Sequence, residues 1–238
     1  MPTLLLTGFG PFPGAPYNPT MKLVRALARL RRPALADTKI VAHIFTTSYA
    51  AVDRDLPALI AQHRPNALLM FGLHGRAKAI RIETRARNAL ALLPDASGKV
   101  LRRGVIAPDA PSAKTLPMPA QRLLAAAREA RVPAVLSRDA GRYLCNYLCW
   151  RAVDSDVPLA VFVHVPKVAR FARPLPSFRG AAQRRTRNPA MSAHTAAGFR
   201  ARALHARPGM TGWRFTAADL SRAGEKVLLA LRDAVNRT

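Results

Sequence analysis

The sequence has few cysteines, few acidic residues and no long hydrophobic run, and each shortage excludes a class of protein. Only two of its 238 residues are cysteines, Cys145 and Cys149, and two cysteines cannot build a disulfide framework. We therefore expect a reducing, cytoplasmic setting. No stretch of about 18 residues is apolar and free of charge, which excludes a membrane-spanning helix. Half of the chain is hydrophobic, so it supplies one sizeable core and is not disordered.

The charge of the chain is strongly one-sided. There are 38 Lys and Arg residues against 13 Asp and Glu residues, which gives a formal net charge of +25 at pH 7. Such a balance favours anionic partners, including nucleic acid. A general enrichment of arginine and alanine explains the balance equally well, and net charge alone identifies no binding site. We therefore do not expect nucleic acid as a partner, although the charge by itself does not exclude it.

Short apolar runs alternate with amphipathic segments along the chain. The apolar runs predict strands near residues 4–6, 39–45, 67–71, 133–136 and 159–163. The amphipathic segments predict helices over residues 19–31, 50–63, 119–131, 141–153 and 216–236. The last helix carries a capping-box pattern, with Thr216 followed by Asp219. Alternation of this kind is typical of βαβ units, so we predict an α/β fold with a mostly parallel central sheet.

Two segments interrupt this alternation. Residues 94–119 contain five prolines and two glycines, which predicts a long loop. Residues 157–218 contain no acidic residue and eleven basic ones. Within that stretch, we expect an exposed Arg-rich insertion at about residues 170–210. The predicted organisation is a single domain over residues 1–238 that carries this insertion.

Cys145 is the candidate nucleophile. Ser137 and Asp139 are good N-cap residues, and we expect a helix to begin close to Arg142. Cys145 then lies in the first helical turn, where the helix dipole and Arg142 favour a thiolate. The alternative is a buried cysteine that acts as a small hydrophobic side chain, and we assign Cys149 to that class. The two cysteines are unsuited to a zinc site because no second Cys or His pair follows at ligand spacing, and the sequence suggests neither a metal nor a cofactor.

Histidine is the usual base for a thiol nucleophile, and six histidines are present. His164 is the preferred candidate because it follows the apolar run 159–163, and ligands gather where parallel strands end. We expect the loop after the strand near Leu136 to open at the same edge of the sheet, which would bring Cys145 close to His164. A buried histidine of the core is the alternative explanation.

A third group, normally a carboxylate, orients the imidazole of such a site. The chain has only three glutamates, and Glu129 and Glu225 are expected to be solvated on helices. Glu83 follows the segment Ile80–Ile82. An ion pair with a neighbouring arginine, such as Arg81, is the alternative role for its carboxylate.

The first loop, Thr7–Gly14, follows an apolar run that predicts a buried first strand rather than a signal peptide. The loop is glycine-rich, but it fails the dinucleotide-binding pattern because Pro11 and Pro13 stiffen it and its third glycine is misplaced. A rigid loop that presents Phe9 and Phe12 suits the wall of a small apolar pocket. The alternative is that both phenylalanines belong to the core.

Four segments of the chain, taken in order, carry a family resemblance. They are Leu6–Phe12 with Asn18-Pro19, Gly75-Arg76 with Ile82-Glu83 and Asn88, Ala140–Asn146, and Phe162–Pro166. Together they resemble the pyroglutamyl peptidase I (pyrrolidone-carboxylate peptidase) family of cysteine peptidases. The resemblance covers roughly residues 3–168 and, more loosely, the C-terminal helix. It implies a three-layer α/β/α sandwich, in agreement with the alternation described above.

The resemblance also implies an activity, the removal of an N-terminal pyroglutamyl residue from peptides by a cysteine-type aminopeptidase. Cys145 would attack the carbonyl carbon, His164 would take the thiol proton and return one to the leaving amine, and Glu83 would orient His164. The backbone near Cys145, with a donor such as Arg76, would hold the oxyanion.

A pyroglutamyl lactam is flat and neutral, so a mainly apolar slot suits it, whereas a charged N-terminal amine would be costly to desolvate there. The family resemblance implies that this slot is formed by aromatic and apolar side chains with a few polar ones. The residues expected to bind the substrate are Phe9, Phe12, Asn18, Tyr143, Leu144 and Arg76.

The chain departs from the family pattern in three places. Leu93 stands where bacterial members carry an arginine ten residues after the glutamate, the spacing from Arg76 to Glu83 is one residue longer, and the Arg-rich stretch has no counterpart. These departures affect how the oxyanion is held, which substrate is chosen and how the protein assembles. The assemblies that stay open include a homo-oligomer. Two alternatives therefore stay open: a catalytically drifted relative that binds anionic partners or nucleic acid, and a cysteine hydrolase of another small amide or lactam.

Overall fold

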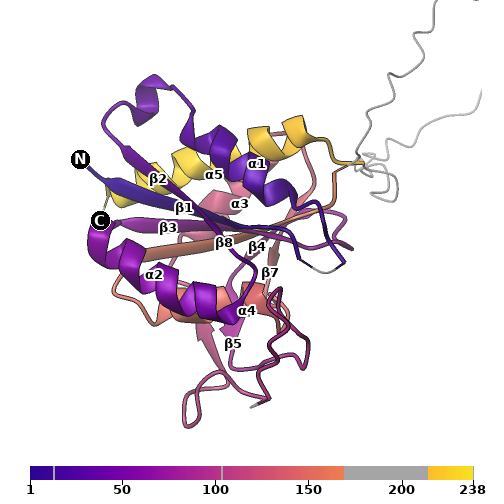
Figure 1. The fold of residues 1–238 in the computed structure, drawn as a ribbon. Coiled ribbons are helices and arrows are strands. Elements are labelled where there is room, and N and C mark those ends of the chain that lie inside the picture. Colours follow the sequence, from indigo (N-terminus) through magenta and orange to yellow (C-terminus); the bar gives the residue numbers. More distant parts are fainter. Residues whose placement is uncertain (13, 103, 169–213, 238) are drawn as a thin grey trace, which may run out of the picture.

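The computed structural model describes residues 1–12, 14–102, 104–168 and 214–237 (Figure 1). The Arg-rich insertion expected at about residues 170–210 lies outside these ranges, so the predicted single domain with an insertion stays a prediction. No helix within the described ranges is long and apolar enough to cross a membrane.

A six-stranded sheet forms the centre of the fold (Figure 1). Its strands, in spatial order, are β2 (Lys39–Phe45), β1 (Thr3–Phe9), β3 (Ala67–Leu73), β8 (Leu159–Val165), β4 (Ile80–Glu83) and β7 (Ala134–Ser137). The first four strands are mutually parallel, whereas β4 is antiparallel to β8 and parallel to β7. The mostly parallel sheet predicted from the sequence is therefore confirmed.

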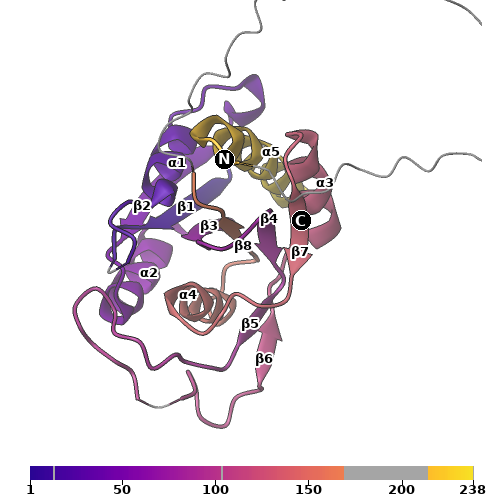
Figure 2. The same ribbon diagram turned by 90° about the vertical axis from the view of Figure 1, so that its right-hand side faces the viewer.

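Helices cover both faces of the sheet and complete three layers (Figure 2). One face carries α1 (Pro19–Ala28), α3 (Ala120–Glu129) and α5 (Ala217–Val235), and the other carries α2 (Tyr49–His63) and α4 (Leu144–Val153). Successive side chains of a strand point to opposite faces, so Leu4 and Leu6 enter one core while Leu5 enters the other. This two-sided burial explains why β1 and β3 are continuous apolar runs without polar alternation.

The ends of the helices follow from local capping chemistry. The Asn18 side chain accepts from the Thr20 N–H at 3.1 Å and caps α1, and Thr216 and Asp219 form the predicted capping box at the start of α5. Helix α4 begins at Leu144, close to Arg142 as predicted, but the expected N-cap residues Ser137 and Asp139 were wrong. Its N-cap is Tyr143, which makes no side-chain cap, while Ser137 ends β7.

The long proline-rich loop is held in place by polar side chains that are buried beneath it. It contains the short strand β6 (Ala113–Thr115), which pairs with β5 (Arg85–Arg87) in a two-stranded ribbon beside α4 (Figure 2). The carboxylate of Asp95 accepts hydrogen bonds from the backbone of Tyr49, Ser97 and Lys99 at 2.9–3.1 Å. These hydrogen bonds hold the start of the loop in one conformation.

The strands β4 and β7 do not run in the direction expected from the sequence. Glu83 lies opposite Phe162 of β8 and beside Ser137 of β7, and both short strands run against β8. The loop after β7 therefore does not open at the carboxyl edge of β8, and that expectation was wrong. Cys145 approaches His164 from the face of the sheet that α4 covers.

Candidate active site

Cys145 is the second residue of α4, and its sulfur lies against the carboxyl end of β3. Gly72 provides the space for it. A Cβ atom at Gly72 would come within 2.8 Å of Cys145 Sγ and 2.7 Å of the Phe162 ring, far closer than such atoms approach one another. The absence of a side chain at Gly72 is therefore what allows the thiol to pack onto the strand.

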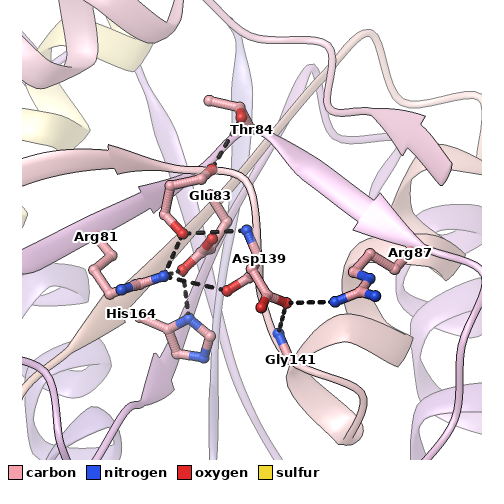
Figure 3. Close-up of polar contacts among 8 residues, drawn as sticks. Arg81, Glu83, Thr84, Arg87, Asp139, Gly141 and His164 are labelled. Atoms are coloured by element: carbon pink, nitrogen blue, oxygen red, sulfur yellow. Dashed lines mark hydrogen bonds and ion pairs between the residues drawn. The ribbon is translucent and has the colours of Figure 1, made fainter.

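His164 lies beside this thiol, at the end of the neighbouring strand β8. Its Nδ1 donates a hydrogen bond to Oε1 of Glu83 at 2.8 Å, and only 3% of the imidazole and none of the carboxylate is exposed (Figure 3). Since Nδ1 is committed to Glu83, Nε2 is the ring nitrogen left to interact with the Cys145 thiol. The three side chains thus form one continuous line of contacts.

The electrostatics of the line favour a protonated imidazole. Burial by itself would lower the pKa of His164, but the charge of Cys145 and the hydrogen bonds with Cys145 and Glu83 raise it to about 9. Cys149, four residues further along α4, is fully buried, and burial raises the pKa of its thiol well above the ordinary value. Only Cys145 is partly open to solvent, so the two cysteines of one helix have opposite environments.

Glu83 is held from its other side by Arg81. The Arg81 Nε donates to Glu83 Oε1 at 3.2 Å, and its Nη2 donates to Ser137 Oγ at 2.6 Å (Figure 3). Burial would raise the pKa of Glu83, but hydrogen bonds with His164 and Ser137 and the charges of His164 and Arg81 lower it. Glu83 therefore remains a carboxylate, and it makes both contacts that the sequence left open: one with the imidazole and one with an arginine.

An open cavity of about 650 Å³ lies over Cys145 and His164. Its lining combines the thiol and the imidazole with aromatic and cationic side chains. Among the other lining residues are Phe12, His74, Arg76, Arg81, Tyr143 and Lys167. The ring centroids of Phe12 and Tyr143 lie 6.4 Å apart with the ring planes tilted by 53°, which gives the cavity an aromatic side. Within the described ranges, no cluster of three or more His, Cys, Asp or Glu side chains is placed to hold a metal ion.

The family model described as pyroglutamyl peptidase matches residues 2–196. The chain belongs to this family. It is accordingly a cysteine peptidase of the pyroglutamyl peptidase type. The match runs through all four segments that carried the resemblance in the sequence.

Relatives and solved structures agree with this assignment. The chain is 33% identical to the pyrrolidone-carboxylate peptidase of Deinococcus radiodurans over 187 residues, which is 75% of this chain and 84% of that protein. It is 32% identical to the enzyme of the same name from Pseudomonas fluorescens, over 70% of this chain and 79% of that one. The pyrrolidone carboxyl peptidase structure from Thermococcus litoralis matches with a TM-score of 0.65 at 28% identity, over 71% and 78% of the two chains.

Three of the six predicted substrate-binding residues line the cavity of this peptidase, namely Phe12, Tyr143 and Arg76. The other three lie behind it. Phe9 is 2% exposed and packs on Phe45 in the core, and Leu144 is buried in the same cluster. Asn18 caps α1 and donates from Nδ2 to the Gly10 carbonyl at 3.1 Å. These three side chains are buried and do not line the cavity.

Leu93, which occupies the position of the missing arginine, is exposed on the loop next to the cavity. The Tyr143 hydroxyl donates to the Pro94 carbonyl at 2.9 Å, which fixes this loop to the residue just before α4. Asn146 supports the preceding segment because its Nδ2 donates to the carbonyls of Arg87 and Ala89 at 2.8 and 3.1 Å. The loop therefore carries an apolar side chain where relatives were expected to carry a cation.

Two residues of the cavity, His74 and Lys167, were not predicted from the sequence. The His74 ring meets the His164 ring edge to face with centroids 5.4 Å apart. Burial, followed by the charges of His164 and Arg81, lowers the pKa of His74, so its ring is neutral beside a protonated neighbour. Each of the two residues comes just after the apolar run of β3 or β8, and that position was the signal available in the sequence.

Proposed function

We propose that this peptidase hydrolyses the amide bond that follows an N-terminal pyroglutamyl residue, with Cys145 as nucleophile, His164 as acid and base, and Glu83 as the group that orients His164. The observation that carries the proposal is the buried line of contacts from Glu83 through His164 to Cys145, which ends on the floor of an open cavity. This is the arrangement of nucleophile, base and orienting carboxylate that acyl transfer requires.

In the first half of the reaction, the Cys145 thiolate attacks the pyroglutamyl carbonyl carbon and forms a C–S bond. The tetrahedral intermediate then collapses, the C–N bond breaks, and the His164 imidazolium gives its proton to the leaving amine. In the second half, His164 takes a proton from water, which attacks the thioester. Breakage of the C–S bond releases pyroglutamic acid and restores the thiolate–imidazolium pair.

The negative charge of both tetrahedral intermediates needs donors close to Cys145. The first N–H groups of an α-helix have no partner within the helix, and the helix dipole is positive at that end. Because Cys145 lies in the first turn of α4, these N–H groups are next to the reacting carbonyl oxygen. They form the oxyanion hole of the proposed reaction. Help from Arg76 stays a prediction, since its side chain lies on the open rim of the cavity.

Substrate selection in this proposal rests on the aromatic side of the cavity. Phe12 and Tyr143 offer flat apolar surface to the lactam ring, while a charged prolyl amine at the same place would lose its hydration without a counter-ion. We also infer a cytoplasmic location and a peptide as the physiological substrate. The first inference is supported by the free state of both cysteines, one of them a nucleophile that must stay reduced.

The experiment compares wild type, Cys145→Ala and Cys149→Ala on a fluorogenic pyroglutamyl amide and on the matching prolyl amide. Wild type should release the fluorophore from the pyroglutamyl amide only. Cys145→Ala should lose at least about 10³-fold in kcat, because it lacks the nucleophile. Cys149→Ala is the matched control on the same helix and should retain turnover. A Cys145→Ala protein with wild-type turnover would exclude the mechanism.

A further inference from the structure

Two cations stand at the rim of the cavity without a carboxylate partner. Arg76 follows β3 and Lys167 follows β8, and both side chains are exposed to solvent. Among the residues that the structure describes, neither takes part in an ion pair, whereas Arg81 is paired with Glu83 and Arg87 with Asp139. The two free charges therefore face the open side of the cavity.

The acidic side chain of the cavity lining does not neutralise them. Asp139 is engaged elsewhere, because its Oδ1 accepts from Gly141 N–H at 3.0 Å and lies 3.4 Å from Nη1 of Arg87. The residues outside the described ranges carry no Asp or Glu side chain at all. The sequence thus offers no further carboxylate side chain from those segments that could cover Arg76 or Lys167.

The side chain of Lys167 lies against the residue that precedes Arg76. Gly75 has no side chain, and a Cβ placed there would lie 3.0 Å from Cε of Lys167. The lysine stem therefore runs across Gly75, next to Arg76 in the chain. Like charges that share one rim repel each other, and an anion bound near both relieves the repulsion.

The direction of the cavity decides what this anion would be. The pyroglutamyl carbonyl must sit at Cys145 and the lactam ring on the aromatic side, beside Phe12 and Tyr143. Lys167 and Arg76 line the same cavity as Cys145, and we infer that the leaving residue extends from Cys145 towards them. A negative charge on that residue would meet both cations.

Resting on the proposed function, we propose that this enzyme prefers pyroglutamyl peptides that carry a carboxylate on the residue after the pyroglutamyl group. The carboxylate is either the side chain of an acidic residue or the free α-carboxylate of a dipeptide. Exposed ion pairs are weak, so the two cations together should give about a three- to tenfold advantage in kcat/KM at low salt. The charge lies away from the reacting bond, so the difference should appear in KM rather than in kcat.

The test uses substrates of matched shape. Pyroglutamyl-glutamic acid amide and pyroglutamyl-glutamine amide differ only in the charge of the side chain, and pyroglutamyl-alanine with and without a C-terminal amide differs only in the α-carboxylate. The first pair should show the advantage if a side chain is recognised, and the second if the chain end is recognised. Raising the salt concentration to about 1 M should remove either preference, because it screens exposed charges.

Charge reversal at the rim supplies the matched variants. Lys167→Glu should abolish the preference for the carboxylate substrates and favour pyroglutamyl-lysine amide instead. Lys39→Glu makes the same change in net charge at the exposed start of β2, where the opposite edge of the sheet lies, and should keep the wild-type preference. A protein that cleaves all of these amides with equal KM, or a preference that survives Lys167→Glu, overturns the inference while leaving the proposed function intact. A protein that cleaves none of them overturns both.

Discussion

The buried half of the site and its open rim are built in opposite ways. In the buried half, Glu83, His164 and Arg81 are joined by hydrogen bonds and ion pairs at 2.8–3.2 Å, and the thiol of Cys145 completes the line. At the rim, the cations Arg76 and Lys167 are exposed and have no carboxylate partner within the described ranges. The same cavity therefore combines buried groups that are held in place by their partners with exposed cations at its rim.

Desolvation explains the difference. A charged group that is removed from water is strongly destabilised unless partners surround it, so the buried groups must be paired and are held in one geometry. An exposed cation keeps its water and needs no partner. The groups proposed to carry out catalysis thus lie where the fold holds them in one geometry. The groups proposed to recognise the substrate lie at the surface, where a single substitution costs little folding stability. Substitutions in the buried half and around the cavity test this contrast.

Replacing Glu83 with glutamine should have the largest effect. The amide cannot stabilise an imidazolium, and the corresponding change in serine triads lowers kcat about 10⁴-fold. It also leaves Arg81 and His164 without their shared buried anion, which should cost about 3–5 kcal/mol of folding stability. Steady-state kinetics and denaturant unfolding measure the two effects. A variant within tenfold of wild-type kcat would mean that the buried half does not depend on its carboxylate.

Replacing Gly72 with alanine should displace the thiol rather than remove it. The new methyl group overlaps Cys145 Sγ and the Phe162 ring, so kcat should fall about 10²-fold and stability by about 1–3 kcal/mol. Gly10→Ala is the matched control, since a Cβ there meets only the Phe45 carbonyl oxygen at 3.4 Å. Equal kinetics for the two variants would show that the sulfur tolerates a different position.

The charge state of His164 gives a smaller and more specific effect. Its raised pKa means that the ring keeps its proton from neutral pH up to about 9 and loses it above that value. The ring signal of labelled histidine in NMR should therefore titrate near pH 9 in wild type. In Cys145→Ala the midpoint should fall, because the charge and hydrogen bond of Cys145 no longer oppose the effect of burial. An unchanged midpoint would contradict direct contact between sulfur and imidazole.

Replacing Tyr143 with phenylalanine should have the smallest effect of the four. It removes the exposed hydrogen bond to the Pro94 carbonyl but keeps the aromatic side of the cavity. Stability should fall by about 0.5 kcal/mol, and KM should rise by about two- to threefold as the loop loosens. A loss of kcat comparable to that of Gly72→Ala would place Tyr143 in the chemical half of the site.

Much of the fold is predictable from the sequence, because β1, β2, β3, β7 and β8 are apolar runs and their helices are amphipathic. The strand β4 is not, since Ile80–Glu83 alternates apolar and charged residues and was too short to stand out. Its direction is also invisible in the pattern, because side chains alternate identically in parallel and antiparallel strands. Yet that reversed strand is the one that carries Glu83 and Arg81 to the imidazole.

The residues of the site likewise divide into those that could be predicted from the sequence and those that could not. The residues with a distinctive chemical context, Cys145, His164 and Glu83, were found from the sequence, and the structure brings them together. His74 and Lys167 are ordinary residues in the sequence that follow strands. They become part of one cavity only because β3 and β8, separated by more than eighty residues, are neighbours in the sheet. Strand order is a property of the whole chain, and no local pattern encodes it.

The difference in exposure between Cys145 and Cys149 provides a way to measure how much of a preparation is correctly folded. A thiol reagent added to the folded protein should react once per chain, and the same reagent in denaturant should react twice, because one sulfur is sealed inside the protein. In a fully folded preparation the ratio of the first reading to the second is one half, and it rises towards one as the fraction of unfolded chains increases. It therefore separates damaged enzyme from intrinsically slow enzyme before any rate is interpreted.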